Sequence, residues 1–228
     1  MIKVSSLISL LEKNNSRFFT GVPDSVLKGL SSYLQNKDKK KHIIATNEGS
    51  AVSIGIGHYL STKKVPCVYM QNSGLSNALN PLISIAHKKV YSIPLILIIG
   101  WRGSPRIKDE PQHNVKGKIT EQILKLLNIK YTILRSNNDL NKFDKQIKIA
   151  KKNKSITACL IEQGTLKKNN KIIKRKDYYK LNKEFFLKTL LESLEKKTKI
   201  ISSTGYNSRE LMHLREKYKL KNSKDFYM

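Results

Sequence analysis

Residues 65–81 read VPCVYMQNSGLSNALNP, and this stretch decides the fold. An apolar run, 65–71, is followed at once by the polar turn Asn72-Ser73-Gly74 and then by a helix-like segment from Leu75 to about Lys88. The apolar run is nearly continuous, which is typical of a strand covered on both faces. The stretch therefore predicts a strand–helix unit of a parallel sheet.

The same alternation continues on both sides of this stretch. The expected strands are 17–20, 42–46, 65–71, 95–99, 131–134 and 157–162. The expected helices are 4–13, 24–33, 49–61, 75–88, 120–127 and 140–153, with an irregular polar stretch over 101–118. This order predicts an α/β fold, a doubly wound parallel sheet flanked by helices.

The remainder of the chain predicts the start of a second α/β domain. We expect a first domain over 1–166, a linker over 167–183 and an incomplete domain over 184–228, with a helix, a strand and another helix at 182–196, 199–203 and 208–217. So few elements cannot bury their own faces. Either they pack on the first domain, or the chain is an incomplete version of something larger.

The chain is strongly basic. Its 228 residues hold 44 Lys+Arg against 17 Asp+Glu, a formal net charge of +27, and only 7 of the basic residues are Arg. Nucleic-acid recognition relies heavily on Arg, and Lys, Asn and Ile share AT-rich codons. Genome composition is therefore the simpler explanation, with a polyanion-binding surface as the alternative. The field is still expected to steer small anions towards the protein.

Composition excludes several other classes. The longest apolar run is far short of the roughly 20 residues that span a bilayer, and the N-terminus predicts an amphipathic helix rather than a signal peptide. Cys67 and Cys159 lie in strand-like runs, where buried reduced thiols are expected. The His residues form no metal-binding spacing, and common phosphate-loop motifs are absent. We expect a cytoplasmic protein.

Polar residues gather after four expected strands, where ligands of open parallel sheets bind. Glu48 follows one strand and precedes a run of small residues, although a carboxylate at a helix start also simply complements the helix dipole. Asp24 and Asn72 follow two other strands. His113 falls in the irregular stretch, where an exposed histidine is the alternative interpretation.

Six motifs combine these pieces in one order. They are GVPDS (21–25), NEGSA (47–51), QNSGLSNALNP (71–81), GWRG (100–103), KDEPQH (108–113) and STG with SRE (203–210). As an ordered set covering nearly the whole chain, they resemble the thiamine-diphosphate-dependent 2-oxoacid decarboxylases. Ser76 stands where that family has glycine.

The resemblance implies thiamine diphosphate as cofactor and decarboxylation of phosphonopyruvate to phosphonoacetaldehyde and CO2. Sulfopyruvate is the alternative substrate. In that family a glutamate at the position of Glu48 hydrogen-bonds the aminopyrimidine ring and favours loss of the thiazolium C2 proton. A non-catalytic scaffold or polyanion-binding protein is the alternative of another class.

The resemblance also implies roles for individual residues. The expected catalytic residues are Glu48, Asp24 and His113, the last two for proton transfer. The expected cofactor-binding residues are Glu48, Asn72, Ser73, Gly74 and Gly205. The expected substrate-binding residues are Asn72, Arg102, Arg106 and Lys108.

The family's second domain binds the diphosphate through Mg2+ with a Gly-Asp-Gly motif, and this sequence has no such motif. The Mg2+ ligands are therefore expected on a missing second domain, with no metal ligand in this chain. The chain alone would hold half a site, as a fragment, a split-gene product or a subunit. The expected partners are a small anionic 2-oxoacid and either a second copy or a separate diphosphate-domain chain, with no specific nucleic acid and no membrane.

Overall fold

The computed structural model describes residues 1–167, 181–195, 198–203, 205–219 and 225–227. The chain divides into two compact units, Met1–Ile172 and Ile173–Met228. Residues 168–180 of the expected linker, 167–183, lie outside the described residues.

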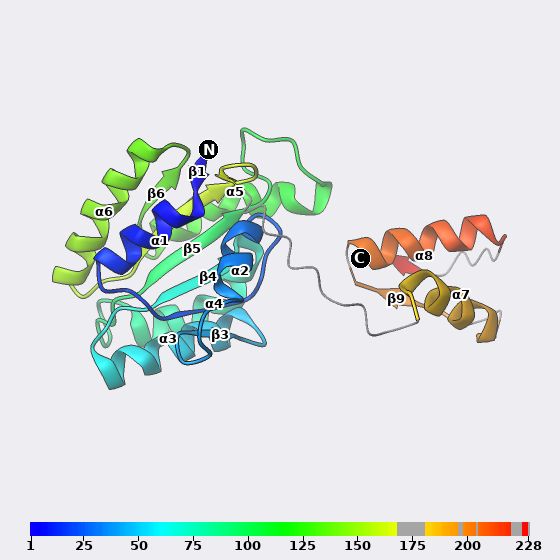
Figure 1. The fold of residues 1–228 in the computed structure, drawn as a ribbon, viewed down its shortest axis with the longest axis horizontal. Coiled ribbons are helices and arrows are strands. Elements are labelled where there is room, and N and C mark those ends of the chain that lie inside the picture. The colour runs from blue at the N-terminus through cyan, green and yellow to red at the C-terminus, as the bar shows by residue number, and fades with distance from the viewer. Residues whose placement is uncertain (168–180, 196–197, 204, 220–224, 228) are drawn as a thin grey trace. The chain divides into compact units, whose positions relative to one another are not determined.

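A six-stranded parallel sheet forms the centre of the first unit, in the order β3-β2-β4-β5-β7-β6 (Figure 1). Its strands are β2 (Phe19–Gly21), β3 (His42–Ile44), β4 (Cys67–Gln71), β5 (Ile96–Trp101), β6 (Lys130–Leu134) and β7 (Thr157–Glu162). The chain goes from β2 outward to β3 and then returns to the other side of β2 with β4. The topological switch point therefore lies between β2 and β4, and the expected doubly wound sheet is confirmed.

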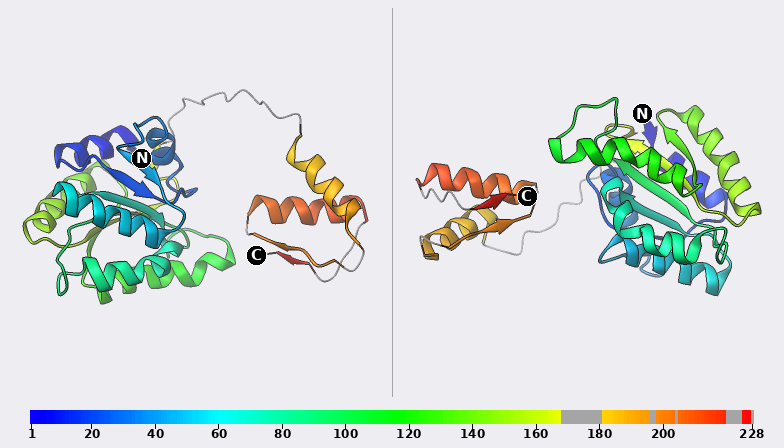
Figure 2. Two further views of the ribbon diagram at one scale, coloured as in Figure 1. Left: turned by 90° about the horizontal axis from the view of Figure 1, so that it is seen from below. Right: turned by 180° about the vertical axis from the view of Figure 1, so that it is seen from behind.

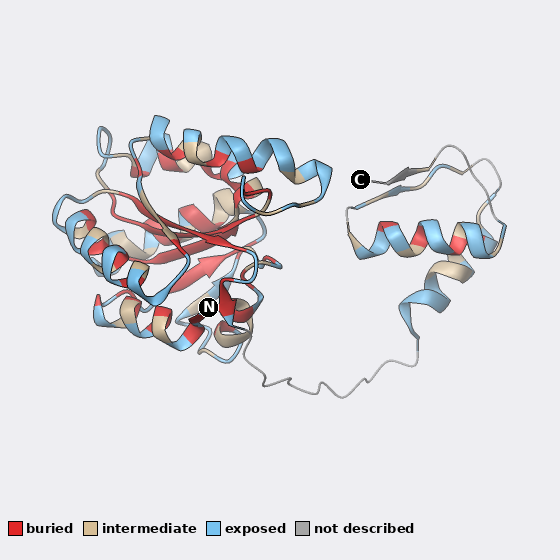
Figure 3. Ribbon diagram, turned by 90° about the horizontal axis from the view of Figure 1, so that it is seen from above, coloured by how far each residue is buried: buried red, intermediate tan, exposed pale blue. Residues whose placement is uncertain are grey.

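Helices cover both faces of this sheet (Figures 1 and 2). The helices are α1 (Val4–Lys13), α2 (Lys28–Leu34), α3 (Glu48–Thr62), α4 (Leu75–Pro81), α5 (Pro111–Leu126) and α6 (Asn137–Lys152), with a short 3-10 turn η1 (Asn72–Gly74) and a π-helical turn η2 (Leu82–Ala86). Apolar residues of α1, α2 and α6 form one core, and those of α3, α4, η2 and α5 form the other. The four inner strands, β2, β4, β5 and β7, are buried between these cores (Figure 3), as expected from their apolar sequence, whereas the edge strands β3 and β6 are partly exposed.

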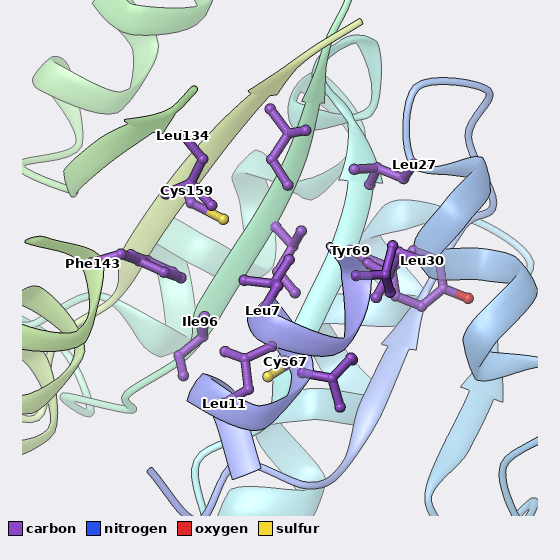
Figure 4. Packing of buried hydrophobic residues seen from close by; sticks show 14 of the residues in the cluster. Leu7, Leu11, Leu27, Leu30, Cys67, Tyr69, Ile96, Leu134, Phe143 and Cys159 are labelled. Atoms are coloured by element: carbon purple, nitrogen blue, oxygen red, sulfur yellow. The ribbon is translucent and has the colours of Figure 1, made fainter. Parts of the chain in front are cut away.

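Helix α1 shows how an amphipathic pattern becomes packing. Its buried residues Val4, Leu7, Ile8 and Leu11 recur at helical spacing on one face. Leu7 and Leu11 lie against the sheet near Ile96 and Cys67 (Figure 4). The predicted helix over 4–13 is confirmed.

Helix α5 differs from the prediction. It begins at Pro111 and runs to Leu126, so much of the stretch 101–118 expected to be irregular is helical, and His113 lies in the first helical turn rather than in a loop. Proline at the first helical position fixes φ and loses no hydrogen bond. The turn containing Gly117 is held by the Trp101 indole, whose Nε1 donates to the Gly117 carbonyl at 2.9 Å.

Two other helices also differ at their ends. The helix expected over 75–88 ends at Pro81 and continues as the π-helical turn Leu82–Ala86, next to a proline that has no backbone N–H. Helix α2 begins at Lys28 without a side-chain cap. Asp24 instead accepts hydrogen bonds in the turn before it.

Three short strands, β1, β8 and β10, were not expected, whereas β9 lies within the strand expected over 199–203. β1 (Ile2–Lys3) pairs in parallel with β8 (Leu166–Lys167), which joins the two ends of the first unit. In the second unit, β9 (Ile201–Ser202) pairs with β10 (Phe226–Tyr227), beside α7 (Lys183–Ser193) and α8 (Tyr206–Lys217). This unit has a small core of Leu191, Leu211 and Leu214.

Cys67 and Cys159 are free and buried, as predicted, and burial raises the pKa of both thiols. Among the described residues, none of the helices has the length and hydropathy of a membrane span.

A buried tyrosine joins three strands beside the switch point. The Tyr69 ring from β4 lies over Gly21 of β2, where a Cβ would stand 2.6 Å from the ring's Cγ. Because Gly21 has no side chain, the Tyr69 hydroxyl extends to Nε2 of His42 on β3, at 2.8 Å. Burial raises the pKa of Tyr69 to about 12 and lowers the pKa of His42. Both groups are therefore neutral at pH 7.

We predict that acid destabilises the first unit partly through His42. Since the folded state binds this proton less readily than the unfolded state, stability is complete above the ordinary histidine pKa of about 6.5 and falls as the pH drops below it. The His42→Gln variant, which cannot titrate, should lose less melting temperature between pH 7.5 and pH 5.5 than the wild type. Thermal melts followed by circular dichroism test this; equal losses in both proteins would exclude His42 as a contributor.

Candidate active site

The sheet order places four strand ends side by side. β3, β2, β4 and β5 are consecutive neighbours, and all run in the same direction. The segments after their carboxyl ends carry Glu48, Asp24, Asn72 and Arg102. The structure thus places four of the predicted site residues along one edge, around the switch point where ligands of such sheets bind.

Asp24 lies just after β2 and is 9% exposed. Its Oδ2 accepts from the backbone N–H groups of Val26 at 3.0 Å and Leu27 at 3.1 Å, and its Oδ1 accepts from Nε2 of Gln71 at 2.7 Å. The carboxylate packs directly against the backbone of Gly100. A Cβ at that position would stand 2.2 Å from Oδ2, so no larger residue fits there without a shift. Three donors thus fix the orientation of Asp24.

Glu48 begins α3, directly after the capping residue Asn47. Its side chain lies across Gly74, where a Cβ would stand 2.4 Å from Oε1. Its Oε2 accepts from Nδ2 of Asn77 at 2.9 Å, whereas Oε1 has no hydrogen bond within the part of the chain that the structure describes. Helices α3 and α4 also approach closely at Gly49, where a Cβ would stand 2.8 Å from the Asn77 carbonyl oxygen.

Asn72 is 4% exposed and bonded internally. Its Nδ2 donates to the Arg102 carbonyl and to Thr120 Oγ1, both at 2.9 Å, and its Oδ1 accepts from the Arg102 N–H at 3.0 Å. Both amide hydrogens are therefore used. The geometry shows Asn72 joining the ends of β4 and β5 to α5, and its expected contacts with cofactor and substrate stay predictions.

Arg102 forms a bidentate ion pair within its own loop. Its Nε and Nη2 donate to Asp109 at 2.6 and 2.5 Å, and Nη1 lies 3.3 Å from Ser25 Oγ. Asp109 also accepts from the Gly103 and Glu110 N–H groups. The hydrogen bonds from Arg102 hold the pKa of Asp109 well below its usual range and raise that of Arg102. The pair stays ionised and holds the loop on β5.

His113 lies in the first turn of α5 and is partly buried. Burial lowers its pKa, the nearby Arg102 charge lowers it further, and Asp109 and Asp24 oppose this. His113, Arg102, Asp109 and Asp24 thus form one electrostatic neighbourhood, in which the imidazole is neutral at pH 7.

The other predicted residues divide into three groups. Ser73 donates through Oγ to Gln71 Oε1 at 2.7 Å and so joins the Asp24 network. Arg106 and Lys108 are exposed, and Lys108 and Arg102 line a hollow of about 640 Å³, together with Asp109, Glu110, Pro111, Asn114 and Gln163. Gly205, with φ of +104°, precedes α8 and belongs to the second unit, whereas the other predicted site residues belong to the first.

Two residues of the network were not predicted as site residues. Gln71 connects Asp24 to Ser73, and Asn77 holds Glu48. Gln71 could have been found from its position at a strand end. Asn77 lies inside a helix, and only the crossing of α3 and α4 brings it to Glu48.

The comparisons with known proteins agree with this arrangement. Residues 4–124 match the family model "Thiamine pyrophosphate enzyme, N-terminal TPP binding domain". The chain is 34% identical over 139 residues to the phosphonopyruvate decarboxylase of Streptomyces viridochromogenes, a match that covers 61% of this chain and 34% of that protein. The chain thus spans about a third of the length of this relative.

Two further likenesses differ in coverage. The chain is 36% identical over 114 residues to the sulfopyruvate decarboxylase subunit alpha of Methanococcus maripaludis, covering 50% of this chain and 66% of that subunit. The structure of benzoylformate decarboxylase from Polynucleobacter necessarius matches with a TM-score of 0.54 at 17% identity, over 92% of this chain and 40% of that one. At this identity, the structural match supports the fold alone.

We predict that Gly74→Ala disrupts the site whereas Gly57→Ala does not. The new methyl at position 74 overlaps Glu48, and such overpacking costs about 1–3 kcal/mol of unfolding free energy. Gly57 is the matched control, because it lies inside α3 with nothing within 4 Å of a new Cβ, so alanine there should stabilise by up to about 1 kcal/mol. Urea unfolding measures both effects. Equal responses of the two variants would contradict the close packing of Glu48 on Gly74.

Proposed function

The chain belongs to the thiamine pyrophosphate enzymes through their N-terminal TPP binding domain, and from this premise we propose that it supplies the pyrimidine-activating half of a decarboxylase active site. The proposed reaction converts phosphonopyruvate to phosphonoacetaldehyde and CO2 in the cytoplasm. The observation that carries the proposal is Glu48, which is held between Gly74 and Asn77 beside the switch point and has one carboxyl oxygen without a hydrogen bond among the described residues.

The residues present fit the cofactor. A ring nitrogen of thiamine diphosphate needs a carboxyl partner, and Glu48 offers Oε1 while Asn77 occupies Oε2. Gly74 keeps this carboxyl free of a competing side chain. When bound, the cofactor supplies the carbon nucleophile and the electron sink for decarboxylation. The part of this chain is to hold Glu48 in one orientation towards the ring.

Asp24 and His113 are proposed to take part in proton transfer to or from the substrate. Asp24 accepts three hydrogen bonds, an arrangement that suits a carboxylate acting as acceptor. His113 is neutral at pH 7 because its pKa is lowered, so one ring nitrogen can accept a proton and the other can donate one.

Arg102 and Lys108 are proposed to bind the anionic end of the substrate in the hollow beside α5. Asp109 and Ser25 use three N–H groups of Arg102, and within the residues that the structure describes this leaves one donor on each Nη atom. Asn72 is proposed to act here by holding the Arg102 backbone. Arg106, exposed in the same loop, is proposed to add to the local positive charge.

Mg2+ and the diphosphate are proposed to bind outside the first unit. Among the described residues, no group of three or more His, Cys, Asp or Glu side chains could hold a metal ion. Because this sequence lacks the Gly-Asp-Gly motif, a separate diphosphate-domain chain is proposed to supply these ligands. Gly205, from this chain or from a second copy, is proposed to belong to the same half of the site. The relatives named as subunits alpha support a separate partner chain.

Sulfopyruvate is the second candidate substrate. The observation favouring it is coverage: the chain matches 71% of a sulfopyruvate decarboxylase subunit alpha of Methanocaldococcus jannaschii, against 34% of the phosphonopyruvate decarboxylase. The two acids differ in the charge of their terminal group, so relative turnover separates the candidates.

We predict decarboxylation of phosphonopyruvate in the presence of thiamine diphosphate and Mg2+ when this chain is co-expressed with the product of the DNA immediately downstream. CO2 release is measured for both substrates, with this chain alone and with the co-expressed product. Glu48→Gln should lower kcat by about 100-fold or more, since a general acid–base contribution of this size is lost.

Asn77→Ala is the companion variant, because it leaves Glu48 in place but removes its hydrogen bond. This variant should lower both the affinity for the cofactor, measured by calorimetry, and kcat. The fold loss in affinity should be smaller than the fold loss in kcat. Full activity of Glu48→Gln would contradict the role of Glu48. Absence of turnover with either acid, in a folded complex that binds the cofactor, would refute the substrate proposal.

We predict an acid limb in the pH profile of kcat/KM that depends on His113. Its lowered pKa places the midpoint below about 6.5, so activity should fall as the pH drops through that midpoint and His113 becomes charged. The limb should disappear in His113→Gln together with most of the activity. An unchanged limb in this variant would assign the ionisation to another group.

A further inference from the structure

The positive charge of the first unit is concentrated at one edge of the sheet. Because all six strands are parallel, the segments entering them share the edge opposite the candidate site. We call these segments (13–18, 35–42, 62–66, 87–95, 125–130 and 151–156) the basic edge. Its exposed basic residues are Lys13, Arg17, Lys39, Lys40, Lys41, Lys63, Lys64, Lys88, Lys89, Lys125, Lys130, Lys152 and Lys154.

Acidic residues are nearly missing from the same segments. Asp38 is their one acidic residue, and its Oδ1 already accepts from the Lys40 backbone N–H. The opposite edge is formed by the segments that follow the carboxyl ends of the six strands. There, acidic residues are as numerous as basic ones. The acidic ones are Asp24, Glu48, Asp109, Glu110, Asp139 and Glu162; the basic ones are Lys28, Arg102, Arg106, Lys108, Arg135 and Lys167.

The helix ends explain part of this asymmetry. The C-termini of α1, α3, α5 and α6 all lead into the basic edge, and lysine is favourable at helix C-termini. Whatever its origin, an excess of exposed cations on one face creates a field that attracts polyanions.

A hollow lies within the basic edge. Its volume is about 240 Å³, and its lining is contributed by the loops before β5, β6 and β7. Leu127, Ile129 and Ile156 form the apolar part of its wall, and the exposed Lys88 and Lys89 also line it. In the same loop as these lysines, Tyr91 is 71% exposed.

We propose that the basic edge binds single-stranded nucleic acid through its phosphodiester backbone, without sequence preference. Lysines on several loops suit phosphate contacts, and the scarcity of Arg argues against reading of base edges. An exposed tyrosine beside lysines is a stacking position for an unpaired base. The proposal does not depend on the decarboxylase function, because it concerns the opposite edge of the sheet.

The test is fluorescence anisotropy of a labelled 20-nucleotide oligouridylate with the full chain at 50–300 mM salt. Kd should rise steeply with salt, because each phosphate contact contributes about 0.7 to the log–log slope for single strands. The variant K40Q/K64Q/K89Q removes one lysine from each of three loops. It should weaken binding by about tenfold or more and reduce the slope by about 2.

The control variant K118Q/K142Q/K145Q removes the same charge from exposed positions on the outer faces of α5 and α6. It should change Kd by less than about twofold, whereas Tyr91→Ser should weaken binding without changing the salt slope. Equal weakening in both lysine variants would overturn the proposal, because the charge would then act diffusely. Failure to bind at physiological salt, or tighter binding to phosphatidylserine vesicles than to the oligonucleotide, would also overturn it.

Discussion

The close crossing of α3 with the turn η1 and helix α4 is the constraint on which the candidate site depends. Two glycines permit it: Gly74 lies beneath Glu48, and Gly49 lies against the Asn77 carbonyl. With a methyl at either position the two segments would have to separate, and the 2.9 Å hydrogen bond from Asn77 to Glu48 would be lost. The orientation of the carboxyl group therefore follows from the absence of two side chains.

The second carboxylate, Asp24, is held in the same way, by packing against the backbone of a glycine. Asp24 lies on the backbone of Gly100 at the neighbouring strand end, and its oxygens are occupied by Gln71 and two backbone N–H groups. Packing on bare backbone removes the freedom that a loop carboxylate ordinarily has. Glu48 differs because, within the described part of the chain, one of its oxygens has no hydrogen bond, and this is why Glu48 is the carboxylate proposed to meet the cofactor, whereas the bonds of Asp24 fix its position.

The sheet and the composition of its polar edge could be predicted from sequence, because continuous apolar runs such as 65–71 identify buried parallel strands and polar residues follow them directly. The start of α5 at Pro111 was missed because residues 101–118 are polar and show little periodicity; the fixed φ of the proline and the Trp101 bond to Gly117 decide it. The role of Asn77 could not be predicted, since it depends on how closely two helices cross.

The distribution of charge changes what the net charge of +27 means for the site. The expected steering of small anions towards the protein stays a prediction, but within the first unit the excess of basic residues lies on the edge opposite the candidate site. β4 has five residues, so the two edges are separated by about 17 Å at roughly 3.3 Å per residue. This exceeds the Debye length of about 8 Å at physiological salt. The proposed recognition of an anionic substrate therefore depends on cations in the site loop itself, Arg102 and Lys108, and on the Asp109 ion pair that holds Arg102 on β5.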